Sequence, residues 1–375
     1  MSLRNSLIAV FAAWQLDAQT PVPGASRSSV KVNLPPDSLV GLISADWGES
    51  RTADRGSATI LNLSTSLSLR NLSNRKIRAI SWMVISQEVT PGGRAAVTKA
   101  SLDVAPGENF PLRVDLRLLR PVQRHEGPMV EMTLDGVLFD DLSFQGPNRL
   151  DSRRTMTAFE MEARRDRKYL QEVLQARGTD GLKQECLASL ARQADMPRLN
   201  VALARAGRTT GADPEREVQF SFLRFPDAPV EPVSGMARLA GGEARAPKLE
   251  VVNRSRRDVR YLEIGWILKD QKGREFLAGA VPAKTALMPG GRTQVLQDAS
   301  LRFSEPTGET VPVGGMTGFV SQVEFSDGSV WIPSRGELRD PTLQKALYPS
   351  AEEQRLTNLY RRKGLQALVD ELKKF

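Results

Sequence analysis

A ten-residue stretch occurs twice in this 375-residue sequence and constrains the fold more than any other feature. The two copies, residues 71–80 and 253–262, share the pattern Asn-x-Ser-x-Arg-x-(Ile/Val)-Arg-x-(Ile/Leu). Asn and Ser favour turns because their short side chains bond to nearby backbone groups, and alternating apolar residues favour strands. We therefore interpret each copy as a tight turn that leads into a buried strand of a β-sandwich.

Two further landmarks follow in the same order in both halves of the chain. A Pro-Gly turn at 105–108 resembles that at 288–291, and the pair Asp135-Gly136 resembles Asp327-Gly328. The offset between the copies grows from 182 (253 − 71) to 192 (327 − 135) residues. Surface loops tolerate such length changes at little cost. The repeat therefore predicts two duplicated domains, because its period is far too long for a solenoid.

The strand patterns predict how each domain is built. Apolar residues alternate with polar ones from Leu61 to Leu69, which is typical of a strand with one solvated face. The same period places Trp82 and Trp266 on the inner face of equivalent strands, as in immunoglobulin-like sandwiches. An Asp-Gly pair between apolar runs predicts a hairpin. The predicted fold is mainly β with α: two immunoglobulin-like antiparallel β-sandwiches, each followed by a helical segment.

Helical periodicity follows each predicted sandwich. One helix is expected from about 153 to Gly178, which stops it, and Asp180 caps a second helix. Near the C-terminus, Asp340 precedes a Pro at the start of a short helix, and Ser350 begins a capping box with Glu353. The last amphipathic helix is expected to bend at Gly364.

These patterns divide the chain into seven predicted segments. They are a signal peptide (1–19), a linker (20–29), a first β-sandwich (30–147), a helical segment (148–200), a second linker (201–216), a second β-sandwich (217–336) and a C-terminal helical tail (337–375).

The first segment resembles an export signal. A positive charge at Arg4 precedes the apolar run 7–14, which is too short to span a bilayer, and Ala18 offers a small residue for cleavage before Gln19. We therefore expect a periplasmic or secreted bacterial protein with no membrane span in its mature chain. The alternative is a short amphipathic N-terminal helix that packs on the fold.

Cysteine and histidine are each present once, as Cys186 and His125. No intramolecular disulfide can form, a Cys/His metal site has too few ligands, and a Ser-His-Asp set would depend on His125 alone. His125 lies in a basic loop, and Cys186 fits a small buried hydrophobic residue. We expect no catalytic residues, no cofactor and no metal.

The formal net charge is +8, which is compatible with an anionic partner. Several basic residues fall on the predicted helices and are candidate contacts for such a partner: Arg153, Arg154, Arg164, Arg165, Arg167, Lys168, Arg361, Arg362 and Lys363. Acidic residues interleave with them, so a solvated helix face is the favoured interpretation and a phosphate-binding stripe is the alternative.

The second copy also carries a family resemblance. The turn 253–255, the strand 264–269, the hairpin at Gly273 and the Pro-Gly turn at 288–290 resemble FxLYD-like and late-embryogenesis-like sandwich domains of exported bacterial proteins. The Phe-x-Leu-Tyr-Asp signature itself is missing. The resemblance implies a binding or structural module and transfers no site residues.

The sequence thus favours an exported, non-enzymatic binding or scaffolding protein with a protein or cell-envelope partner. One alternative is a basic module that binds nucleic acid or an anionic polymer through its Arg-rich helices. Another is a hydrolase with a site between the two domains.

Overall fold

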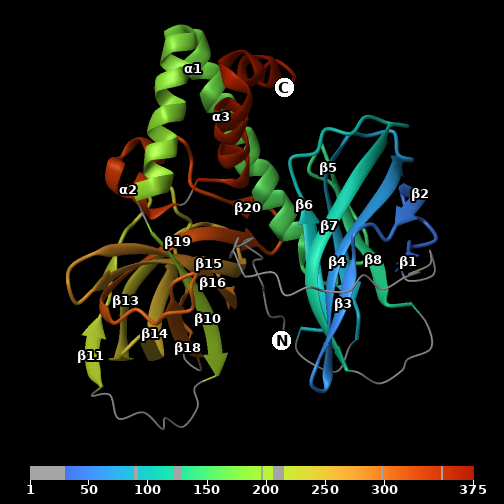
Figure 1. Ribbon diagram of the computed structural model, residues 1–375. Helices are drawn as coiled ribbons and strands as arrows, with labels where there is room; N and C mark the ends of the chain where they lie inside the picture. The colour runs from blue at the N-terminus through green and yellow to red at the C-terminus, as the bar shows by residue number, and fades with distance from the viewer. Residues whose placement is uncertain are drawn as a thin grey trace. The chain divides into compact units, whose positions relative to one another are not determined.

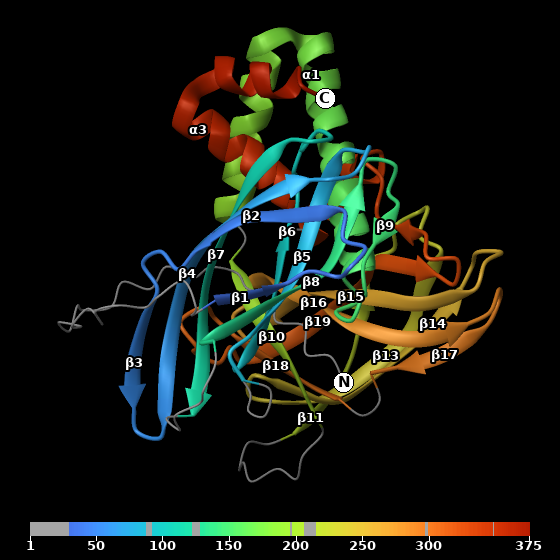
Figure 2. The ribbon, with the colours of Figure 1, turned by 90° about the vertical axis from the view of Figure 1, so that its right-hand side faces the viewer.

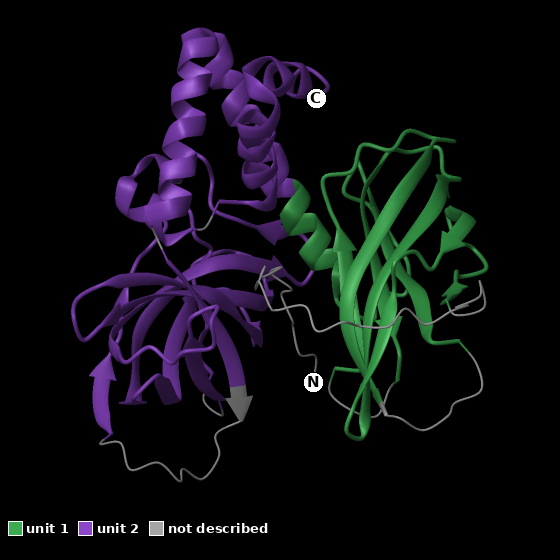
Figure 3. Cartoon of the chain, viewed as in Figure 1, with its two compact units in different colours: residues 1–160 green, residues 161–375 purple. Residues whose placement is uncertain are grey.

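The computed structural model describes residues 30–87, 92–121, 128–195, 197–205, 215–296, 299–347 and 349–375. The fold is mainly β with α, as the sequence predicts. The chain divides into two compact units, residues 1–160 (unit 1) and residues 161–375 (unit 2) (Figure 3).

Unit 1 contains two sheets that enclose one core. The first sheet has the spatial order β1 (Val30–Asn33), β8 (Val130–Phe139), β5 (Ile77–Ile85) and β6 (Arg94–Lys99), and β9 (Phe144–Gln145) also pairs with β8. In the second sheet, β4 (Ala58–Asn71) pairs with β2 (Val40–Asp46), β3 (Arg51–Arg55) and β7 (Asn109–Pro121). The long strands β4 and β7 run side by side and antiparallel (Figures 1 and 2).

The predicted alternation along β4 is confirmed. Leu61, Leu63, Leu67 and Leu69 are buried in the core of unit 1, and Thr65 is buried on the same face. The residues that alternate with them, Asn62, Ser64, Ser66 and Ser68, are exposed or half-buried. Trp82 of β5 is fully buried in the same core, because alternate side chains of a strand point to opposite faces.

Unit 2 contains one large curled sheet. Its spatial order is β11 (Arg216–Gln219), β13 (Val230–Ala240), β14 (Glu243–Asn253), β18 (Ala299–Ser304), β10 (Arg198–Arg205), β16 (Glu275–Leu287), β15 (Val259–Asp270), β19 (Val313–Phe325) and β12 (Ser221–Phe222). Two short strands lie off this path, β17 (Arg292–Val295) on β14 and β20 (Val330–Trp331) on β19.

The sheet of unit 2 curls until strands from its two ends meet, which gives it a barrel-like form (Figure 1). β13 lies in contact with β19, and the amide of Val313 donates a 3.1 Å hydrogen bond to the carbonyl of Gly241 at the β13–β14 turn. The core inside contains Trp266, which is fully buried and meets Phe220 edge to face at 4.9 Å. The predicted turn before β16 is present, with Gly273 at φ 85°.

The helical predictions are confirmed in outline. Helix α1 (Ser152–Asp195) is broken at Gly178, whose φ of 65° and ψ of −165° end one helical segment before the next begins. Helix α2 (Pro341–Ala346) is capped by Asp340, and α3 (Ala351–Leu372) is capped by Ser350. α3 is itself broken at Gly364, where φ is 83°. A short 3₁₀ helix, η2 (Glu337–Arg339), precedes α2.

The part of α1 that belongs to unit 2 packs with α3 around a small apolar cluster. Its fully buried members include Leu182, Cys186, Leu356 and Leu368. The burial of Cys186 agrees with its expected role as a small hydrophobic residue. Within the described ranges, every helix is too short or too polar to cross a bilayer.

The repeated motif forms a hydrogen-bonded turn at the end of β4. The side-chain amide of the buried Asn71 donates to the carbonyls of Arg75 at 2.8 Å and Val104 at 3.2 Å. Its side-chain oxygen accepts from the backbone amide of Ser73 at 3.0 Å, and its carbonyl accepts from Gly107 at 2.9 Å. Asn71 thereby ties its own turn to the Pro-Gly turn, and this explains why both motifs occur together.

The second copy of the motif makes the same bonds at the end of β14. The side-chain amide of the buried Asn253 donates to Arg257 at 2.7 Å and to Leu287 at 3.0 Å. Its side-chain oxygen accepts from the Ser255 amide at 2.9 Å, and its carbonyl accepts from Gly290 at 3.0 Å.

In unit 1, the Arg of the repeated motif contacts residues at the end of a neighbouring strand. The Arg75 guanidinium lies 3.9 Å above the Phe139 ring and 3.4 Å from the Asp141 carboxylate, and it also bonds to Ser143. Hydrogen bonds from the Ser143 hydroxyl and amide lower the pKa of Asp141.

Arg257 of unit 2 makes the corresponding set of contacts. It lies 3.8 Å above the Phe325 ring, 2.6 Å from Asp327, and within a hydrogen bond of Ser329. Backbone and side-chain hydrogen bonds from Ser329, followed by the bond from Arg257, lower the pKa of Asp327 to about 2.

The prediction of an Asp135-Gly136 hairpin is wrong. Both residues lie inside β8, where Asp135 accepts hydrogen bonds from the segment that leads into α1, including 2.6 Å from the Ser152 hydroxyl. The counterpart of Asp327-Gly328 is instead Asp141-Leu142, where Leu142 adopts a φ of 62°. The matching offset is therefore 186 residues (327 − 141). Because a leucine, not a glycine, adopts the left-handed backbone conformation here, a search for Asp-Gly does not find this turn.

The boundaries of the predicted segments also differ from the structure. β10 occupies part of the segments predicted as helix (148–200) and linker (201–216), because its backbone pairs with β18 and β16. The boundary between the units falls within α1, so this helix contributes to both. The predicted signal peptide and first linker (1–29) and His125 lie outside the described residues.

Candidate functional site

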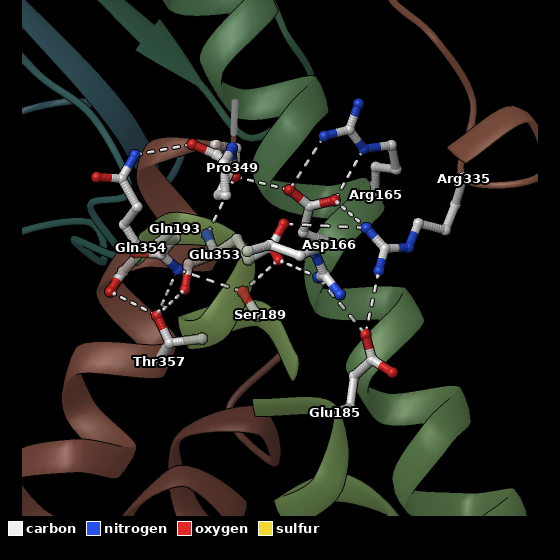
Figure 4. Close-up of polar contacts among 12 residues, drawn as sticks. Arg165, Asp166, Glu185, Ser189, Gln193, Arg335, Pro349, Glu353, Gln354 and Thr357 are labelled. Carbon is white, nitrogen blue, oxygen red and sulfur yellow. Dashed lines mark hydrogen bonds and ion pairs between the residues drawn. The ribbon is translucent and has the colours of Figure 1, made fainter. Parts of the chain in front are cut away.

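Three carboxylates converge between α1 and α3 in unit 2 (Figure 4). Asp166 and Glu353 are buried, and the side chain of Glu185 is only 14% exposed. Asp166 accepts from the Ser350 hydroxyl at 2.6 Å, and Glu353 accepts from the Ser189 hydroxyl at 2.6 Å. Asp166 and Glu353 are thus each held by a hydroxyl from the other helix or its cap.

Arg335 joins these three carboxylates from the segment that follows β20. Its guanidinium nitrogens lie 3.6 Å from Glu185 and 3.9 Å from both Asp166 and Glu353. The guanidinium also stacks 3.6 Å above the Tyr169 ring, a favourable cation–π position. The residue therefore connects the sheet of unit 2 to its helices.

Two further arginines balance the remaining negative charge. Arg165 binds both oxygens of Asp166 at 2.8 Å and 3.1 Å, and Arg192 lies 3.1 Å from Glu353. We call Asp166, Glu185, Glu353 and the arginines Arg165, Arg192 and Arg335 the helical charge cluster, and the partly exposed Arg177 also lies 3.5 Å from Glu185. Such a paired set holds its helices in one arrangement, because each Arg fork meets its carboxylates in one geometry.

A small cavity of about 10 Å³ lies inside the helical charge cluster, lined in part by Tyr169, Cys186, Ser189 and Thr357. This volume is roughly that needed for one water molecule. The cavity itself is therefore too small to hold a substrate.

Burial raises the pKa of the Cys186 thiol to about 12, and the negative charges of Glu185 and Glu353 add to the effect. Only the thiolate reacts with alkylating reagents. We therefore expect Cys186 to resist iodoacetamide at pH 8 in the folded chain and to react fully in denaturant. Mass spectrometry of the labelled protein checks this, and rapid labelling of the native chain would show that the helices open readily.

A second buried pair lies beside the first cluster. Arg167 of α1 contacts Glu352 of α3 at 3.2 Å, and their side chains are only 5% and 1% exposed. Arg355 binds the same carboxylate through two bonds of 2.8 Å. The Phe375 ring covers Arg167 at 4.1 Å, so the end of the chain packs against α1.

Glu162 lies one helical turn before Asp166. The residue as a whole is half-buried, but protein atoms surround its carboxyl group closely enough that desolvation raises its pKa to about 7. The charge of Arg165 opposes this rise, and that of Asp166 adds to it.

The raised pKa of Glu162 makes stability depend on pH. The stability that the protonated Glu162 carboxyl contributes to the folded state is fully present below pH 4.5, the ordinary pKa of a glutamate. It is lost as the pH rises through about 7, the pKa in the folded chain. We expect Glu162→Gln to raise the free energy of unfolding by about 2 to 3 kcal/mol at pH 8 and to change it little at pH 4. Denaturant titrations at both pH values check this, and an equal effect at both would contradict the assignment.

The structure separates the nine basic residues that the sequence suggested as contacts for an anionic partner. Arg154, Arg165 and Arg167 are buried or half-buried, and the last two are occupied by Asp166 and Glu352. Arg153 is half-buried. The exposed members are Arg164, Lys168, Arg361, Arg362 and Lys363, all of them in unit 2.

Sequence reasoning missed most of the helical charge cluster. One available indication was that Asp166 lies between Ala163 and Leu170 on the buried stripe of α1, where a carboxylate needs a partner. Another was the predicted capping box of Ser350 and Glu353. The Glu353 carboxylate of such a box can point away from Ser350 and bind a different partner. No local pattern points to Arg335.

Comparison with known proteins gives no family for this chain. No family model matches it, and no curated protein matches it. Among solved structures, it is similar to one described as CBD12 from CALX1.2, at 6% identity over 91% of this chain and 90% of that chain, with a TM-score of 0.12. It is also similar to a β-glucosidase from Kluyveromyces marxianus, at 9% identity over 72% of this chain and 45% of that chain, with a TM-score of 0.14. Both TM-scores are too low to bear on fold or function.

Proposed function

We propose that the chain is a non-enzymatic binding or scaffolding protein built from two duplicated immunoglobulin-like domains. The observation that carries the proposal is the pair of equivalent turns. Asn71 and Asn253 make the same bonds to their own turn and to a Pro-Gly turn, and Arg75 and Arg257 make the same contacts. Duplication of one domain would leave such a shared hydrogen-bonded turn in both units.

The helical charge cluster supports a structural role. Its carboxylates are all paired with arginines, and its cavity has room for about one water molecule. A glycosidase would need an accessible carboxylate pair beside its substrate. Turnover that survives purification and disappears on a single carboxylate substitution would overturn the non-enzymatic proposal.

We further propose that the mature chain works outside the cytoplasm. The support is the sequence of residues 1–19, with its positive start, short apolar run and Ala18. Fractionation of native cells, followed by measurement of the intact mass and N-terminus, tests the proposal. A chain that starts near Gln19 in the envelope or medium is expected, and a full-length cytoplasmic chain would contradict export.

The exposed cations of unit 2 favour a second candidate function, the binding of nucleic acid or another anionic polymer. Arg361, Arg362 and Lys363 are consecutive and exposed beside the break of α3. Binding of a labelled oligonucleotide should then weaken steeply with salt, and Arg361→Gln with Arg362→Gln should weaken it further. The exposed Arg51→Gln with Arg55→Gln on β3 is a control of equal charge. Equal effects of the two pairs would contradict a site on α3.

A further inference from the structure

An open hollow lies in unit 2 where β11, from one end of the curled sheet, contacts β19. Its volume is about 560 Å³, within the range of about 300 to 1,000 Å³ that is usual for ligand sites. Its lining includes two cations, Arg216 and Lys269, one carboxylate, Asp270, and two glycines, Gly314 and Gly315. We call this hollow the seam hollow.

The two glycines of β19 line the seam hollow with backbone alone. Gly314 is the extra residue of a bulge beside Asp270, and a Cβ on it would lie 2.5 Å from the Asp270 carbonyl oxygen. Close backbone approach therefore requires glycine at position 314. Gly315 pairs with Lys269, and a Cβ on it would meet only the Lys269 Cβ, at 3.9 Å. A side chain at position 315 would therefore fit the strand but occupy the seam hollow.

Arg216 is fixed in place and still has unused donors. Its Nη2 atom donates to the carbonyl of Val313 at 3.0 Å and to that of Gly314 at 2.6 Å. Within the described ranges, its Nε and Nη1 atoms donate to no protein acceptor. The two carbonyls thus hold the guanidinium at the seam hollow and leave part of its fork for a ligand.

Arginines on the adjacent strands differ because they are paired with a carboxylate. Arg238 of β13 and Arg245 of β14 lie 3.4 Å and 2.6 Å from Glu215. Arg216 and Lys269 form no ion pair in the part of the chain that the structure describes. The two cations that line the seam hollow are therefore not neutralised by a partner.

The one carboxylate of the lining is fully engaged elsewhere. Asp270 accepts from the backbone amides of Lys272 and Arg274 at 2.8 Å and 2.9 Å, and from the Arg274 Nε atom at 2.7 Å. Its side chain is only 5% exposed. Glu275 lies opposite Lys269 in the strand register but forms no ion pair with it. The seam hollow therefore presents positive charge.

We propose that the seam hollow binds a small polar molecule through a carboxylate or phosphate group. The planar fork of Arg216 suits two oxygens of such a group, and the Lys269 ammonium adds a point charge. Because the protein already fixes Arg216, binding loses little side-chain freedom. The proposal concerns unit 2 alone and does not depend on duplication or export. The alternative is that Arg216 only fastens β11 to β19.

Amide chemical shifts of the ¹⁵N-labelled full chain, titrated with inorganic phosphate and separately with succinate, test the proposal. We expect saturable shifts at Gly314 and Gly315 with at least one of the two, and little change with chloride at the same ionic strength. The tighter of the two probes identifies the group that the site prefers. No saturable shift at these glycines with either probe would overturn the proposal.

Two variants separate ligand binding from the fastening of β11 to β19, because both leave the Arg216 bonds in place. Lys269→Gln should weaken binding about tenfold, the effect of losing one charged hydrogen bond. Gly315→Leu should abolish binding, because its side chain fills the seam hollow.

Arg292→Gln is the control, since it removes the same charge from a side chain that is 59% exposed elsewhere in unit 2. It should leave binding unchanged, and circular dichroism establishes that each variant is folded. Binding that survives both Lys269→Gln and Gly315→Leu would overturn the proposal and leave Arg216 with a structural role only. Equal weakening by Arg292→Gln and Lys269→Gln would also overturn it, because binding would then follow net charge.

Discussion

Asn71→Ala should lower the free energy of unfolding of unit 1 by roughly 3 to 5 kcal/mol. The Asn71 side chain is fully buried, and its amide group donates to the carbonyls of Arg75, Val104 and Ala105. Its oxygen also accepts from the Ser73 amide. Truncation leaves these groups buried without partners, and each such loss costs about 1 to 3 kcal/mol.

Asn74 of the same turn provides a matched control. It is exposed, so Asn74→Ala should change stability by less than about 0.5 kcal/mol. Asn253→Ala should lower the stability of unit 2 by a similar but smaller amount, because its amide donates to Arg257 and Leu287. Calorimetry of the three variants checks these values, and equal effects of Asn71→Ala and Asn74→Ala would contradict the role of the turn.

Arg335→Gln should destabilise the helical part of unit 2 by about 3 to 5 kcal/mol. The substitution leaves Asp166, Glu185 and Glu353 around a cavity with one cation fewer, and breaking a buried ion pair from one side has a cost of this size. It also removes the cation that stacks on Tyr169.

Thiol labelling provides a local measure of this effect. Cys186 lines the same cavity, so its reaction with iodoacetamide should accelerate in Arg335→Gln. Arg339→Gln is the control, because Arg339 is exposed only four residues away. Arg335→Lys should show an intermediate effect, since an ammonium group keeps the charge but has no planar fork. Unchanged labelling in Arg335→Gln would show that Arg335 does not hold the helices together.

Local patterns were sufficient to predict several strands and the helices. The alternation along β4, the breaks at Gly178 and Gly364, and the caps at Asp340 and Ser350 depend on neighbouring residues alone. The repeated turn was recognisable because Asn and Ser act on their own backbone within four residues.

Features that depend on tertiary contacts were not predictable in this way. Asp135-Gly136 has the composition of a hairpin, but Gly136 is needed because a Cβ there would lie 2.1 Å from the Phe144 ring. β10 lies in a segment whose charged residues resemble a linker, and its strand form depends on two distant neighbours. The helical charge cluster joins residues from 165 to 353, so no short stretch contains its pattern.

Amide hydrogen exchange of the unmodified full chain tests the central claim, that the same hydrogen-bonded turn stabilises each of the two units. The amides of Ser73 and Ser255 donate to Asn71 and Asn253, and those of Gly107 and Gly290 donate to the same two asparagines. All four should exchange as slowly as the core amides of β5 and β15, although they lie in turns. Exchange at the rate of solvated turns in either unit would contradict the claim.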